Sequence, residues 1–154
     1  MSEPSSDCLN TDTFLRTEHI SLFRLRAHYK DYEGEDAHFF RIALSIEHAP
    51  VVLGHLQVEV TGNEVIATSM VLLDEQGTAS LASLNDDELR ALVRESSIAT
   101  VAYHAAAQGV RSLAALIDAR IETEPRTPDF EIDILRPDPD GDQSEDEMET
   151  DAKN

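Results

Sequence analysis

NDDELRALVRESSIATVAYHAAAQGVRSLAALIDARI, residues 85–121, is the stretch that decides the fold. It carries the longest helical pattern in the chain, because apolar residues recur at three- and four-residue steps from Ile98 to Ile117 and form one stripe on an α-helix. Asn85 stands where an N-cap belongs, and Glu88 completes the spacing of a capping box. Ser96-Ser97 interrupts the phase of the stripe. The pattern therefore predicts a short helix over about residues 86–95 and a main helix over about 97–120.

Alternating apolar and polar residues predict four strands before these helices, over residues 19–31, 39–47, 55–61 and 65–73. The first strand is expected to bury Phe23, Leu25, Ala27 and Tyr29 on one face. The fourth strand is apolar on both faces, so we expect its own helix to cover one face and another subunit or a client to cover the other. Gly62-Asn63 is typical of a tight hairpin turn. The run 130–134 reads as a short extended segment or a docking arm.

These elements predict an α+β fold: a four-stranded antiparallel sheet followed by a short and a long helix packed on one face, with a disordered acidic C-terminal tail. The expected boundaries are a flexible N-terminal segment at 1–18, an α+β domain at 19–135 and the disordered tail at 136–154.

The chain is strongly acidic, with a formal net charge of −19 over 154 residues. From residue 137 onward there are eight acidic residues and one lysine, so the first 136 residues still carry −12. Such a charge disfavours nucleic acid and anionic membranes and favours basic protein partners. Cys8 is the only cysteine, the first residues lack the basic start and apolar run of a signal peptide, and no run approaches the ~18 apolar residues of a membrane span. We therefore expect a cytoplasmic protein without membrane insertion.

Residue patterns that carry catalysis or metal binding are absent from the sequence. The six histidines lack the spacing of a metal site, and Cys8 lies in a polar segment without a fixed base. We expect no catalytic residue, no metal and no cofactor. A small enzyme that uses His38, His48 and His55 stays open as an alternative.

The order of elements, together with several segments, resembles the SecB family of export chaperones. Those segments are LNDDEL at 84–89, SIATVAYH at 97–104, EPRTP at 124–128 and DFEIDIL at 129–135. The likeness spans about residues 19–135 and is greatest to the divergent SecB-like chaperones of actinobacteria, some of which serve toxin–antitoxin pairs.

The resemblance implies a cytoplasmic, ATP-independent holdase that is not an enzyme and assembles as a homotetramer. Its partners would be unfolded client proteins and, in addition, a translocase motor or an antitoxin. By this resemblance, clients bind at Ile66, Met70 and Leu72. The oligomer contact falls at Gly109, Leu113 and Leu116. Acidic residues for a motor or other partner are expected at Glu47 and Glu59. The alternative is an acidic adaptor or inhibitor that binds one folded basic partner.

Overall fold

The computed structural model describes residue 15 and residues 17–29, 35–47, 49–60, 62–74 and 81–137. Its elements are β1 (Thr17–Tyr29), β2 (Ala37–Ser45), β3 (Val51–Val60), β4 (Asn63–Leu73), α2 (Asp86–Glu95), α3 (Ile98–Leu116) and β5 (Glu131–Leu135). Most of the predicted tail and most of the predicted N-terminal segment lie outside the described residues. His48, one of the histidines considered above, also lies outside them.

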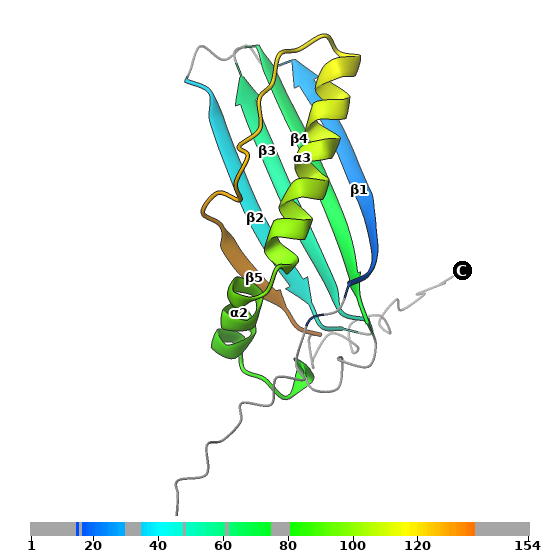
Figure 1. Cartoon of the computed structure of the whole chain (residues 1–154), viewed down its shortest axis with the longest axis vertical. Helices are drawn as coiled ribbons and strands as arrows, with labels where there is room; N and C mark the ends of the chain where they lie inside the picture. The colour runs from blue at the N-terminus through cyan, green and yellow to red at the C-terminus, as the bar shows by residue number, and fades with distance from the viewer. Residues whose placement is uncertain are drawn as a thin grey trace, which may run out of the picture.

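The strands form one five-stranded sheet in the order β1-β4-β3-β2-β5 (Figure 1). The pairs β2–β3, β3–β4 and β1–β4 are antiparallel, as expected for the first four strands. The fifth strand was not predicted as part of the sheet: β5 pairs parallel to β2, with Glu131 beside Arg41 and Leu135 beside Ser45. The α+β class is confirmed, and the sheet is mixed rather than purely antiparallel.

One face of the sheet packs on α3, which lies mainly over β4 and β3 (Figure 1). Because strand side chains alternate, every second residue of these strands points at the helix. The inner residues are fully or nearly fully buried and include Ile42, Leu44, Val52, Leu56, Val58, Val65, Ala67 and Val71. They form the core together with Leu89 and Val93 of α2 and the alanines of α3. The predicted covering of one face by the chain's own helix is confirmed.

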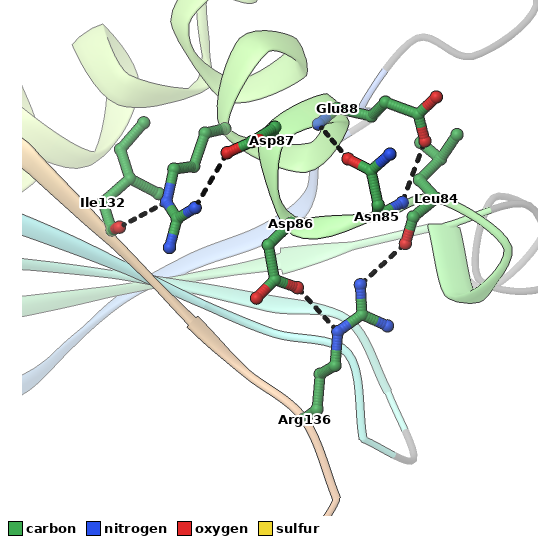
Figure 2. Close-up of polar contacts among 8 residues, drawn as sticks. Leu84, Asn85, Asp86, Asp87, Glu88, Ile132 and Arg136 are labelled. Carbon is green, nitrogen blue, oxygen red and sulfur yellow. Dashed lines mark hydrogen bonds and ion pairs between the residues drawn. The ribbon is translucent and has the colours of Figure 1, made fainter.

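The start of α2 and the break between the two helices lie where local side chains predict, but α3 ends at Leu116, about four residues before the predicted end near residue 120. Asn85 accepts a hydrogen bond from the Glu88 amide at 2.9 Å, and the Glu88 carboxylate accepts one from the Asn85 amide at 2.8 Å (Figure 2). This is the predicted capping box. Ser96 and Ser97 separate α2 from α3, as expected, and the Ser96 hydroxyl accepts a hydrogen bond from the Ile98 amide at 3.3 Å.

Of the four residues expected to be buried on one face of β1, only Ala27 is half-buried, whereas Phe23, Leu25 and Tyr29 are exposed. Phe23 also leaves the alternation, because the register against β4 shifts between Leu22 and Arg24. Phe23 is the extra residue at this bulge, and 61% of its surface is exposed. The shift places Leu22 opposite Ser69 and Leu25 opposite Ala67, so both leucines lie on the α3 side. Tyr29, at the end of the strand, is exposed.

Two arginines fasten β5 to the start of α2 (Figure 2). Arg136 donates to the Asp86 carboxylate at 2.7 Å and to the Leu84 carbonyl at 2.6 Å. Arg90 donates to the Ile132 carbonyl at 3.3 Å, from within the helix. These contacts link an edge strand to a helix about fifty positions earlier in the chain.

Candidate binding surface: the open face of the sheet

The sheet face opposite α3, called the open face here, is covered by neither α2 nor α3. Cross-strand register defines its members. They include Arg24 and Arg26 on β1, Ile66, Thr68, Met70 and Leu72 on β4, Val51, Leu53, His55, Gln57 and Glu59 on β3, and Phe39, Arg41 and Ala43 on β2. The residues on this face change in character along the strands.

One end of the open face is apolar. Leu72 lies beside Val51, and Met70 lies beside Leu53. All four side chains are half-buried, each with neighbours in the sheet but with neither α2 nor α3 above it. These four residues are called the apolar patch below. Ala43 of β2 continues it beyond Leu53.

The middle of the open face is a polar row that crosses the sheet from Arg24 through Thr68 and His55 to Arg41. Thr68 and the Nδ1 of His55 share a hydrogen bond at 3.0 Å. Arg41 donates to Glu131 at 3.0 Å and lies 3.5 Å from Asp133. Burial lowers the pKa of His55, and the positive charges of Arg41 and then Arg24 lower it further. His55 is therefore neutral at pH 7, and the row holds two positive charges around it.

A depression of about 570 Å³ lies at the β5 side of this row, lined in part by Phe39, Arg41, Gln57 and Glu131. Its charges are of both signs, so it offers no consistent preference for an anion or a cation. Within the described ranges, no group of three histidine, cysteine, aspartate or glutamate residues has the geometry to hold a metal ion. His38 and His55 both line the depression without such a third partner.

The residues predicted to bind clients all lie on the open face of β4. Met70 and Leu72 belong to the apolar patch, and Ile66 is separated from them by Thr68. The sequence also contains a pattern that indicates the patch residues Val51 and Leu53, but these residues were not predicted from it. Val51-Val52-Leu53 follows Pro50 with apolar residues of both parities, the same pattern that marked the fourth strand as covered on both faces.

The acids predicted to bind a motor are not brought together. Glu59 is level with Ala37 at one end of β2, whereas Glu47 follows the other end of that strand. Eight steps along β2, about 27 Å, separate Ala37 from Ser45, and Glu47 lies two residues further on. Glu59 also accepts a hydrogen bond from Gln57 at 2.9 Å.

The residues predicted for the oligomer contact differ in position. Gly109 is buried inside the chain: a Cβ there would lie 2.8 Å from Leu25 Cδ2 and 3.1 Å from Ala67 Cβ. Gly109 therefore allows α3 to approach its own sheet, which corrects the expectation that it faces another subunit. Leu113 is half-buried against the core, and Leu116 has 83% of its surface exposed. Leu113 and Leu116 therefore stay predicted residues of an oligomer contact, and Gly109 does not.

Among known proteins, no family model, no curated protein and no solved structure matches this chain. Within the part of the chain that the structure describes, no helix is long and apolar enough to cross a membrane.

Proposed function

We propose that this protein is an ATP-independent chaperone of the cytoplasm that holds unfolded polypeptides on the apolar patch of its open face. The observation that carries the proposal is the two-sided apolar character of β4. Val65, Ala67 and Val71 are buried under α3, whereas Met70 and Leu72 face away from it. A solvated antiparallel sheet face is usually polar, so aliphatic side chains there call for a covering partner.

The size of the patch suits weak and general binding. Complete burial of one large aliphatic side chain stabilises a complex by ~1.5–3 kcal/mol. Because the four patch residues are already half-buried, only part of this is available at each. One patch then binds a client weakly, and several patches in one assembly hold it firmly through their combined effect. This requirement fits the proposed homotetramer, with Leu113 and Leu116 at its contact.

The resemblance to SecB-like chaperones supports the same function. It extends the proposal to a role in export or in the protection of an antitoxin, without a chemical step at any residue. Glu47 and Glu59 stay predicted contacts for a translocase motor, and their separation requires such a partner to span both ends of β2.

The test is suppression of aggregation. Light scattering of a chemically unfolded protein, diluted into buffer, should fall when the chaperone is present. Met70→Asp places a charge in the patch and should abolish most of this effect. Ala91→Asp adds the same charge on the exposed side of α2 and should leave it intact. A wild-type protein that leaves aggregation unchanged would reject the proposal, as would equal effects of the two variants.

The net charge of −19 favours a second function, that of an adaptor or inhibitor for one folded basic protein. Binding of this kind weakens steeply as salt is added, whereas apolar binding of unfolded chains does not. Capture of a single folded partner that is lost at high salt, with no retention of unfolded chains, would establish the alternative.

A further inference from the structure

β1 lies at one edge of the described sheet. It pairs with β4 on one side, and no described strand pairs with its other side (Figure 1). From Thr17 to Arg26 all its residues but Ser21 are exposed. The bulge at Phe23 interrupts the strand, but pairing with β4 is regular from Arg24 to Tyr29. Six regular residues equal the length of an ordinary strand, and their free backbone groups accept a further strand by hydrogen bonding.

The same six residues alternate in chemistry. Leu25 and Ala27 lie on the α3 side, with Leu25 44% exposed. Arg24 and Arg26 lie on the open face, and neither forms an ion pair with another residue of the described ranges. A strand added to this edge has the same two-residue repeat. Its side chains on one face therefore meet aliphatic carbon, and those on the other meet two arginines.

The described strand carries more basic than acidic side chains, unlike the chain as a whole. Thr17–Tyr29 contains Arg24 and Arg26 and only one of the 31 acidic residues, Glu18. The remote acids weigh little on a bound segment, because the Debye length at ~0.15 M salt is about 8 Å. Glu64, which lies beside His28 and accepts a hydrogen bond from Gln57, limits the basic part of the edge to Arg24 and Arg26.

We propose that the edge from Arg24 to His28 binds an extended peptide segment in which acidic and aliphatic residues alternate. The segment adds as a strand, with its acidic side chains beside the two arginines and its aliphatic side chains beside Leu25. A second copy of β1 is a poorer occupant, because antiparallel pairing within 24–28 would set arginines opposite arginines. This inference rests on the proposed function, because the bound segment is taken to be part of a client polypeptide. It adds which class of segment the protein selects.

Fluorescence anisotropy with short synthetic peptides tests the proposal on the full-length protein. A peptide alternating glutamate and valine should bind, and one alternating lysine and valine should bind at least about tenfold more weakly. An N-methylated glutamate–valine peptide keeps the side chains but lacks the backbone donors, and should not bind. The double variant Arg24→Glu/Arg26→Glu should lose about tenfold or more, whereas Arg24→Lys/Arg26→Lys keeps the charge and should stay within a few-fold of wild type.

Three results would overturn the proposal. The first is equal binding of the glutamate and lysine peptides, and the second is unchanged binding after N-methylation. The third is a change of assembly size in Arg24→Glu/Arg26→Glu without a change in peptide binding, which would assign the edge to a second copy. Aggregation assays on the same samples distinguish failure of the edge proposal from failure of the proposed chaperone function. Suppression of aggregation without glutamate–valine binding rejects only the edge proposal, and peptide binding without suppression rejects only the holdase.

Discussion

Gly54 lies where α3 packs closely on β3, and replacing it with alanine should destabilise the fold. A Cβ at this position would lie 2.7 Å from Ser69 Oγ, 2.9 Å from Ala102 Cβ and 3.1 Å from the Ala102 carbonyl oxygen. Ala102 lies in the second turn of α3, within its hydrogen-bonded backbone, so its Cβ and carbonyl cannot retreat alone. The helix must rise from the sheet, or the strand must bend.

The magnitude follows from these contacts. Favourable carbon–carbon separations are about 3.5–4.0 Å, so α3 must move by roughly 0.5–1 Å. Overpacking of this kind costs ~1–3 kcal/mol. The shift also strains the buried hydrogen bond that Ser69 donates to the Ala102 carbonyl at 2.7 Å, which is worth ~0.5–1.5 kcal/mol. Loss of the glycine's freedom in the unfolded chain offsets ~0.4–1 kcal/mol. We expect a net loss of about 2–3 kcal/mol, or roughly 4–12 °C in the melting temperature.

Gly109→Ala is the matched control. Its new Cβ would meet Leu25 Cδ2 at 2.8 Å and Leu22 Cδ2 at 3.0 Å, which are side-chain ends on an edge strand with room to rotate, and only the Ala67 Cβ at 3.1 Å cannot rotate away. Alanine also favours the helix over glycine by about 1 kcal/mol. Urea unfolding of both variants at one protein concentration should show a small effect for Gly109→Ala and a large one for Gly54→Ala. A Gly54→Ala protein within about 0.5 kcal/mol of wild type, the range of neutral surface changes, would refute the reasoning.

Three further predictions concern other contacts. Arg136→Ala removes two hydrogen bonds that hold the end of β5 to the start of α2. Amide exchange at residues 131–135 should then become roughly fivefold faster, equivalent to ~1 kcal/mol of local stability, while the amides of β3 stay protected. Unchanged exchange would show that these hydrogen bonds do not stabilise β5. Burial and two arginines lower the pKa of His55 below the unfolded value of about 6.5, so the unfolded chain takes up its proton first and stability is lost as pH falls below that value. His55→Gln should therefore lose less stability between neutral and mildly acidic pH than wild type does, as measured by urea midpoints, and equal losses would show that His55 does not contribute. Leu116→Asp should reduce the assembly size in light scattering while the far-UV circular dichroism of the folded chain stays unchanged, and an unchanged mass would remove Leu116 from the oligomer contact.

The start of α2 and the break before α3 could be predicted from the sequence because the residues that set them are close neighbours, whereas the end of α3 at Leu116 was placed about four residues too late. Asn85 and Glu88 form reciprocal hydrogen bonds within one turn, whatever packs above them. Gly62 likewise takes a positive φ of 84° in a turn between two adjacent strands, so the hairpin was also predictable.

Strand partners were not predictable in the same way. Alternation shows which residues share a face, but it does not show which strand lies alongside. The pairing of β5 with β2 joins Glu131 to Arg41 across 90 positions, and nothing in the local pattern of either strand specifies it. The bulge at Phe23 is also hidden, because one extra residue reverses the alternation without changing the composition.

The candidate site was predicted in part. Apolar residues of both parities in β4 indicated a second apolar face, and the structure places Met70 and Leu72 on the face away from α3. Completing the patch required the register of β3, which sets Val51 and Leu53 beside them. The basic edge of β1 was missed because an edge is a property of the strand order, which the sequence alone does not reveal.

Site-directed photocrosslinking tests the central claim most directly. A benzophenone amino acid in place of Leu53 lies in the apolar patch, whereas the same group in place of Ala91 lies on the exposed side of α2. With an unfolded client, we predict crosslinks from position 53 and few from position 91, and none from either when the client is folded. Equal crosslinking from both positions, or none from position 53, would contradict the assignment of the open face as the binding surface.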